Sequence, residues 1–125
     1  MSWKFDNSFP IYLQIIERIK LLIASEKWKP GEKIDPVREL AFQIGVNPNT
    51  VQRALSELER EGLIYSVRTS GRFVTENTAL IKKTREKIAE EKIRDFFEFL
   101  FDLGYSSEDI DSILSAKINE FKRGE

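Results

Sequence analysis

The chain contains no cysteine and no histidine among its 125 residues. Disulfides, zinc sites built from these residues, and Cys or Ser–His nucleophiles are therefore excluded. No apolar run approaches the roughly 18 residues that span a membrane, and residues 1–6 lack the features of a secretory signal. No Gly-rich phosphate loop or nucleophile elbow is present either. We therefore expect a cytoplasmic protein that is not an enzyme and binds no metal or cofactor.

The sequence also lacks an excess of positive charge, with 20 basic and 21 acidic residues and a net charge of −1. Residues 1–77 carry 11 basic and 10 acidic side chains, whereas residues 78–125 carry 9 and 11. Nucleic-acid-binding domains are usually basic, so the total argues mildly against that function. Any field that attracts DNA must come from where individual cations are placed.

Apolar periodicity and turn residues predict most of the secondary structure. Three helices are expected over residues 10–25, 35–44 and 47–60, followed by strands 63–67 and 72–75 around a turn at 68–71. Asp35 is expected to accept backbone N–H groups at the start of the second helix, and Asn47 to do the same for the third. Each is followed by a proline, which suits the first helical position.

Residues 78–125 predict two further helices. The first runs to about Leu103, is charged in its first half and apolar in its second, and ends at Gly104. Ser106 and Asp109 then resemble a capping box with Asp in place of Glu. The last helix has one apolar face, formed by Ile110, Ile113, Leu114, Ile118 and Phe121.

The second and third helices, joined by Gly45-Val46-Asn47, predict a helix-turn-helix. Such a unit places its second helix in the major groove of DNA. One face of that helix is apolar (Val51, Ala54, Leu55, Leu58), and the opposite face is polar (Asn49, Arg53, Ser56, Arg60, with Thr50 and Gln52 at its sides). Asn and Gln can pair with adenine, and Arg with guanine. The alternative interpretation is an ordinary solvated face.

Several motifs in order resemble the GntR family of bacterial transcription regulators. They are Pro10-Ile11-Tyr12-Leu13-Gln14-Ile15, Lys29-Pro30-Gly31-Glu32-Lys33, Val37-Arg38-Glu39-Leu40-Ala41, Val46-Asn47-Pro48-Asn49-Thr50-Val51-Gln52-Arg53-Ala54 and Leu58-Glu59-Arg60-Glu61-Gly62-Leu63-Ile64. The Asn-Pro-Asn-Thr-Val string and the short C-terminal segment are most similar to the YtrA subfamily. This resemblance implies a dimeric winged helix regulator, usually a repressor, whose helical tail mainly dimerises. It also suggests control of a neighbouring transporter operon.

The resemblance also implies which residues contact DNA. Arg38 matches an arginine that touches DNA in relatives, and Arg68 and Gly71 match the tip of a wing that enters the minor groove. The recognition-helix positions are Asn47, Asn49, Thr50, Gln52 and Arg53. Lys33 and Arg72 complete the cations expected to anchor phosphates, and an alternative for Arg38 is pairing with Glu39 or Glu32.

Two positions depart from the family pattern. Relatives usually carry Leu-Pro-Ser where this chain has Ile34-Asp35-Pro36, so a serine hydroxyl expected near a phosphate is absent. Thr69 replaces a wing glycine, and threonine fits poorly to a positive φ. We therefore expect a wing that differs in shape or approaches DNA less closely.

The largest apolar cluster lies in the fourth helix. We interpret Ile93, Phe96, Phe97, Leu100 and Phe101 as a dimer interface, because two short helices cannot bury all of them. An alternative is a pocket for a small-molecule effector, whose identity the sequence does not give. Nearby carboxylates (Glu98, Asp102, Asp109, Asp111) are interpreted as solvated charges rather than a metal site.

The sequence thus predicts a mostly α protein with a small β-hairpin. Residues 1–77 form a winged helix-turn-helix DNA-binding domain, and residues 78–125 form a two-helix dimerisation segment. The predicted function is sequence-specific DNA binding as a homodimer on an inverted-repeat operator, without membrane association. The alternative is a winged helix module that binds another protein and not DNA.

Overall fold

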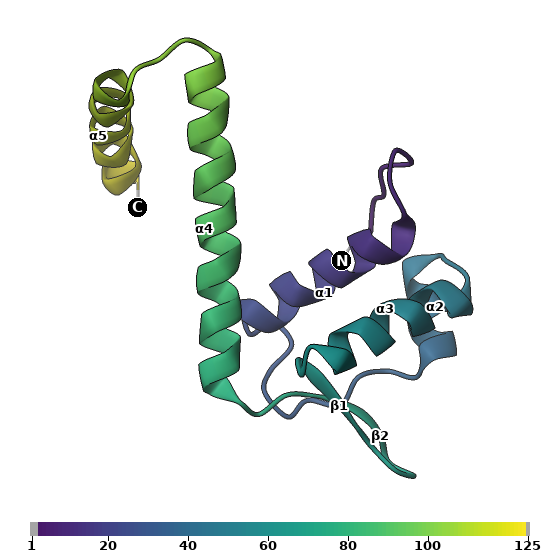
Figure 1. The fold of residues 1–125 in the computed structure, drawn as a ribbon. Helices are drawn as coiled ribbons and strands as arrows, with labels where there is room; N and C mark the ends of the chain where they lie inside the picture. Colours follow the sequence, from purple (N-terminus) through teal and green to yellow (C-terminus); the bar gives the residue numbers. More distant parts are fainter. Residues whose placement is uncertain (1–2, 125) are drawn as a thin grey trace. The chain divides into compact units, whose positions relative to one another are not determined.

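The computed structural model describes residues 3–124, which form five helices and one β-hairpin (Figure 1). The elements are α1 Ile11–Ala24, α2 Val37–Ile44, α3 Pro48–Arg60, β1 Ile64–Val67, β2 Gly71–Val74, α4 Thr78–Asp102 and α5 Ser107–Gly124. The predicted fold class, mostly helical with a small hairpin, is confirmed. The chain divides into two compact units, and the boundary between Arg85 and Glu86 falls inside α4. No helix within residues 3–124 is long and apolar enough to span a membrane.

The first unit is built around one apolar core. Helices α1 and α3 lie side by side, and α2 packs against α3 (Figure 1). The apolar face predicted for α3 is confirmed, because Val51, Ala54, Leu55 and Leu58 are all buried. Helix α1 likewise buries residues at helical spacing: Ile15, Ile16, Ile19, Leu22 and Ile23. Removing these side chains from water supplies the main driving force for folding this unit.

The hairpin is fixed to the helices by the loop that precedes α2. Strands β1 and β2 pair antiparallel, with Tyr65 opposite Phe73. The backbone of residues 31–34 continues the ladder along β2: Gly31 N donates to Val74 O, Val74 N to Glu32 O, and Ile34 N to Arg72 O, each at 2.9 Å. The base of the wing is therefore hydrogen-bonded on both sides of β2.

The start of α2 differs from the sequence prediction. Its first helical residue is Val37, its N-cap is Pro36, and no side chain in the described range caps it. Asp35 lies one residue before the N-cap, so the prediction that it caps α2 is wrong. Its carboxylate instead accepts a hydrogen bond from Gln43 Nε2 at 3.1 Å. The sequence placed Pro36 at the first helical position, whereas the helix begins one residue later, which is within the usual uncertainty of a helix boundary.

The first two turns of α4 belong to the first unit. Ile81 is only 1% exposed and is part of the core. Asn77 Oδ1 accepts from Leu80 N at 3.0 Å at the start of this helix. One turn after Ile81, Arg85 Nε donates to the carbonyl of Ala24 at 2.7 Å and so caps the end of α1.

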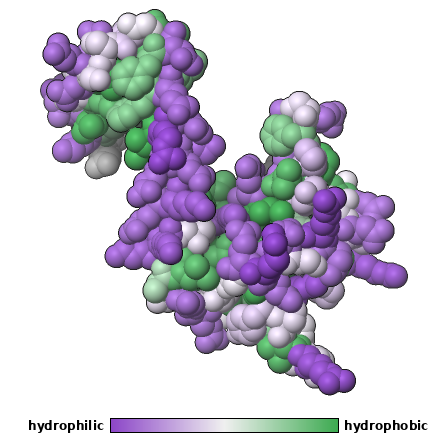
Figure 2. All heavy atoms as spheres, in the orientation of Figure 1, coloured by the Kyte–Doolittle hydropathy of each residue, from purple (hydrophilic) through white to green (hydrophobic). Residues whose placement is uncertain are grey.

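The second unit, from Glu86 onward, has a very small core. Of its apolar side chains in the described range, only Leu100 and Ile110 are buried. The predicted capping box at the start of α5 is confirmed: Asp109 N donates to Ser106 Oγ at 3.1 Å, and Ser106 N donates to Asp109 Oδ2 at 2.9 Å. This backbone hydrogen bond from Ser106 lowers the pKa of Asp109. Large apolar side chains remain exposed over α5 and the end of α4 (Figure 2).

Candidate nucleic-acid interface

Helix α3 presents its polar face to solvent because its apolar face is fixed in the core. The Asn47 side chain caps the helix as predicted, accepting from Asn49 N at 2.8 Å, and Pro48 occupies the first turn. Asn49, Gln52, Arg53 and Ser56 are all exposed, whereas Thr50 is half-buried. Because the Asn47 oxygen is used for capping, its amide N–H groups are what it can still offer a ligand. The Asn49 side chain has no hydrogen-bond partner within residues 3–124, so both of its polar atoms are available.

The two sides of this polar face meet different parts of the first unit. Gln52 Oε1 accepts from Arg72 Nη1 of β2 at 3.3 Å, and Gln52 Nε2 donates to Ser56 Oγ at 3.3 Å. Arg53 instead meets α1, where its Nη2 donates to Tyr12 Oη at 3.1 Å. The polar face of α3 is therefore held by the hairpin on one side and by α1 on the other.

Arg72, predicted as a DNA contact, is largely occupied within the protein. Its Nε lies 3.5 Å from Glu59 Oε1, an ion pair that lacks hydrogen-bond geometry, and its side chain is only 23% exposed. Glu59 also accepts from Ser66 Oγ of β1. These contacts tie β1 and β2 to α3 and reduce the net charge that Arg72 presents outward.

The tip of the wing is an exposed turn that carries Arg68. Arg68 is exposed and forms no ion pair with any residue in the described range. Thr69 adopts φ 71°, so threonine does occupy the left-handed conformation for which it fits poorly. Ser70 N donates to Val67 O at 3.0 Å and closes the turn. The tip thus keeps a tight turn despite losing a glycine.

Lys33 packs closely against Gly71 of the wing. Gly71 has φ 117°, and a Cβ at this position would lie 3.3 Å from Lys33 Cε. Both the conformation and this close approach favour glycine. Lys33 is exposed, so its stem crosses the hairpin beside Gly71 and places a cation at the edge of the wing.

Arg38 lies in the first turn of α2 and is exposed. Within residues 3–124 it forms no ion pair with Glu39, Glu32 or any other carboxylate. The structure therefore does not contain the alternative pairing considered from the sequence. The charge of Arg38 is left for a partner outside the chain.

Sequence reasoning missed one residue at this surface, Tyr12. Tyr12 lies at helical spacing from Ile15, Ile16 and Ile19, and it packs partly against the core. Its ring also lies under the Arg53 guanidinium, with the Arg53 Cζ 3.7 Å from the ring centroid. Contact between residues 41 positions apart leaves no signal in the periodicity of either helix.

Comparison with known proteins identifies the family. Residues 11–74 match the model for bacterial regulatory proteins of the gntR family. The HTH-type transcriptional regulator YhcF of Bacillus subtilis is 36% identical over 110 residues, covering 88% of this chain and 91% of YhcF. The HTH-type transcriptional repressor YtrA of the same organism is 46% identical over 87 residues, covering 68% of this chain and 67% of YtrA.

Solved structures agree with these sequence matches. A GntR family transcriptional regulator from Listeria monocytogenes has a TM-score of 0.82 and 38% identity, covering 90% of this chain and 98% of that one. The DNA-binding domain of AraR in complex with operator ORX1 has a TM-score of 0.54 and 33% identity, covering 60% and 99%. The chain therefore belongs to the GntR family of bacterial regulatory proteins, is similar to members of its YtrA subfamily, and is a DNA-binding transcription regulator.

Proposed function

We propose that this chain is a repressor that binds an inverted-repeat operator as a homodimer, with α3 of each copy in the major groove of one half-site. The observation that carries this proposal is the exposed polar face of α3, which is capped by Asn47 and stands beside a wing with free cations. A recognition helix in this setting contacts base edges with the residues of its first turns. The similar DNA-binding domain of AraR has been solved in complex with an operator, which supports operator binding by this chain.

The predicted contact residues fall into two proposed roles. Asn49, Gln52 and Arg53 face outward and would contact base edges, with Asn47 and Thr50 beside them at the helix start. Arg38, Lys33 and the wing residues Arg68, Gly71 and Arg72 would contact the sugar–phosphate backbone and fix the register. Arg72 would contribute least, because Glu59 and Gln52 already engage its guanidinium.

Dimerisation through the second unit follows from its unburied apolar surface. Of the predicted interface residues, Leu100 is buried and Phe97 is half-buried. The other three, Ile93, Phe96 and Phe101, are about half exposed. Further large apolar side chains of this unit are exposed to a similar or greater extent: Phe99, Leu103, Ile118 and Phe121. Patches of this kind on soluble proteins mark interaction sites. A second copy is the occupant we propose, because a two-fold dimer would present two recognition helices to two half-sites.

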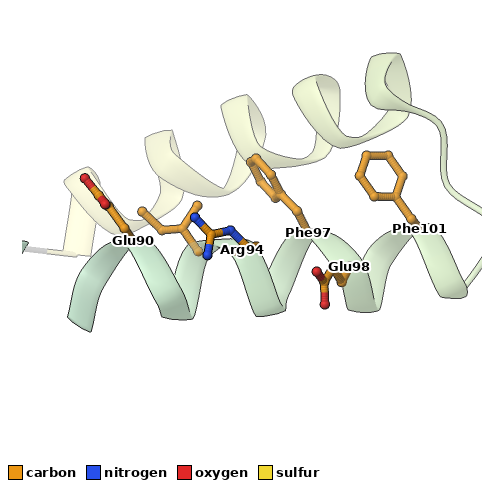
Figure 3. Close-up of a pocket in the computed structure, with 6 residues that line it drawn as sticks. Glu90, Arg94, Phe97, Glu98 and Phe101 are labelled. Atoms are coloured by element: carbon orange, nitrogen blue, oxygen red, sulfur yellow. The ribbon is translucent and has the colours of Figure 1, made fainter. Parts of the chain in front are cut away.

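A depression of about 440 Å³ lies along α4 within this cluster, lined by Ile93, Phe97 and Phe101 together with Glu90, Arg94 and Glu98. Phe97 and Phe101 project from the same side of the helix, and Glu98 projects from the other (Figure 3). An apolar strip between charged side chains suits a helix of a partner copy. A small-molecule effector is the alternative occupant, and its binding would compete with dimerisation.

The decisive experiment is selection of duplexes from a random-sequence library by the full chain, followed by footprinting on the enriched duplex. We expect an inverted repeat with two protected half-sites about one helical turn apart. Failure to enrich any sequence would contradict specific DNA binding and favour the protein-interaction module.

Repression and the target genes need a separate test in cells. From the resemblance to YtrA, we extend the proposal to a cytoplasmic regulator that controls a transporter operon. Deleting the gene should raise the transcript level of the operon that carries the enriched inverted repeat. A fall in that transcript would instead identify an activator.

A further inference from the structure

Arg53 differs from Arg60 of α3 and Arg72 of β2, because both of those arginines form ion pairs with glutamates. Arg60 Nη2 pairs with Glu57 at 2.6 Å, and Arg72 pairs with Glu59. Arg53 forms no ion pair with any residue that the structure describes, and its contact is with the neutral side chain of Tyr12. The protein therefore holds the Arg53 side chain without cancelling its charge.

The geometry of this contact is well suited to presenting a guanidinium. The Arg53 Cζ lies 3.7 Å from the centroid of the Tyr12 ring, and one N–H of Nη2 is used by the hydroxyl at 3.1 Å. The Tyr12 ring and hydroxyl together occupy one side of the guanidinium and one of its five N–H donors. The remaining donors are left for a ligand with two acceptor atoms side by side.

Tyr12 is itself held in place. It is half-buried, packs against the core of the first unit and comes from α1, which lies beside α3. A ring anchored in this way restricts the rotamers of a long side chain that stacks on it. The entropy lost when Arg53 binds DNA is then smaller, because part of it has already been lost in the free protein.

We propose that Tyr12 is a positioning residue for DNA recognition, which fixes the plane of the Arg53 guanidinium so that it can engage a pair of acceptors in one orientation. This inference rests on the proposed role of Arg53 in the function above. The acceptor pair is O6 and N7 of a guanine, or two oxygens of a phosphate, and the two sources give different experimental results.

The test compares variants on two probes, the duplex enriched by the wild-type protein and a scrambled duplex of the same composition. The variants are Tyr12→Leu, Tyr12→Phe, Arg53→Ala and the double variant Tyr12→Leu/Arg53→Ala. Trp3→Leu is the matched control, because the Trp3 ring makes a second cation–π contact, at 5.4 Å, with Arg18 of α1, which is not among the proposed DNA contacts. Thermal unfolding of each variant reports whether the fold is retained.

We expect Tyr12→Leu to weaken binding to the enriched duplex by about fivefold, the range of a cation–π contact. It should add nothing when Arg53 is already alanine. Tyr12→Phe keeps the ring and should retain most of the binding, and Trp3→Leu should bind as the wild type does.

The two acceptor sources are separated by repeating the selection with each variant. If Arg53 contacts guanine, Tyr12→Leu and Arg53→Ala relax base choice at the same position. If it contacts phosphate, both weaken binding to the two probes equally and lower the salt dependence together.

Equal weakening by Tyr12→Leu in the wild-type and Arg53→Ala backgrounds would overturn the inference, as would wild-type affinity in both Tyr12 variants. Should Tyr12→Leu fail to fold, an effect of Tyr12→Phe that persists in the Arg53→Ala background would overturn it too. If Arg53→Ala itself binds normally while Asn49→Ala does not, this inference fails and the proposed function stands.

Discussion

The two units of this protein differ in how completely they bury their apolar residues. The first unit encloses a core to which α1, α2, α3, β1, β2 and the first turns of α4 all contribute. In the second unit, Leu100 and Ile110 are the buried apolar residues of the described range, and their neighbours on both helices remain exposed. Helical stability in proteins comes mainly from packing an apolar face against a neighbour. The two helices of the second unit leave much of that face unpacked.

This difference suggests a division of labour. The unit with the complete core holds the proposed DNA contacts, whereas the unit with the open apolar surface would be completed by the proposed association with a second copy. The charges follow the same division, because residues 86–125 carry 6 basic and 11 acidic side chains, a net negative charge that would not favour DNA.

The largest effect is expected from shortening the chain at two different places. A chain ending at Asn77 loses Ile81, and loss of a buried isoleucine side chain costs about 2–5 kcal/mol, a large part of a small domain's stability. A chain ending at Ile88 keeps Ile81 and the Arg85 cap on α1. We expect the longer one to unfold cooperatively as a monomer and the shorter one to be largely unfolded, as judged by circular dichroism and sedimentation.

The longer fragment also tests linkage between half-sites. Without a second copy attached, its affinity for the enriched duplex should fall by about a hundredfold or more. A fragment ending at Ile88 that dimerises, or that binds as tightly as the full chain, would contradict the role proposed for the second unit.

Salt should also change DNA affinity strongly, without unfolding the protein. If a dimer contacts 6–10 phosphates, affinity falls roughly a thousandfold or more between about 50 and 200 mM salt. The fragment ending at Ile88 should show about half the slope on a log–log plot, because it brings one set of cations. A flat response of the full chain in fluorescence anisotropy would favour the protein-interaction alternative.

Placing a charge on an exposed apolar residue of each unit tests which unit forms the dimer interface. Phe101→Glu adds a carboxylate to the proposed interface, where burying it unpaired is strongly unfavourable. We expect a shift from dimer to monomer, measured by sedimentation at the same concentration. The control is Phe42→Glu, because Phe42 of α2 is 88% exposed and belongs to the first unit; a loss of dimer there would place the interface elsewhere.

The smallest effects concern two candidate helix starts. Ser106→Ala removes a capping hydrogen bond in the second unit and should lower the free energy of unfolding by about 1 kcal/mol. Asp35→Ala removes no cap and should change that quantity by less than about 0.5 kcal/mol, while tightening DNA binding by removing a negative charge near α2. Chemical denaturation of both variants checks the contrast, and a larger loss for Asp35→Ala would restore it as a cap.

The capping box at the start of α5 predicts that the stability of the fold depends on pH. The pKa of Asp109 is lower in the folded protein than its ordinary value of 3.8, so the carboxylate stabilises the fold above that pH. This contribution is lost as the pH falls from 3.8 through the lower folded value. Asp109→Asn should therefore show less of this acid sensitivity than the wild type.

Most helices, the hairpin and the buried face of α3 could be predicted from local patterns in the sequence. Val51, Ala54, Leu55 and Leu58 recur at helical spacing, and all four are buried; Asn47 is followed by Pro48, and its side chain caps α3. The capping box at Ser106 was predicted for the same reason. These features depend on residues at most one or two turns apart, so the information needed to predict them is local.

Which polar side chains form contacts within the protein, and which remain available, could not be predicted from local patterns. The pairing of Arg72 with Glu59 and the stacking of Arg53 on Tyr12 join segments that are distant in sequence. Likewise, Ile81 became a core residue of the first unit although periodicity assigned it to a separate helical segment. Such contacts are set by how helices and strands pack, and packing depends on the shape of the whole core rather than on any one segment.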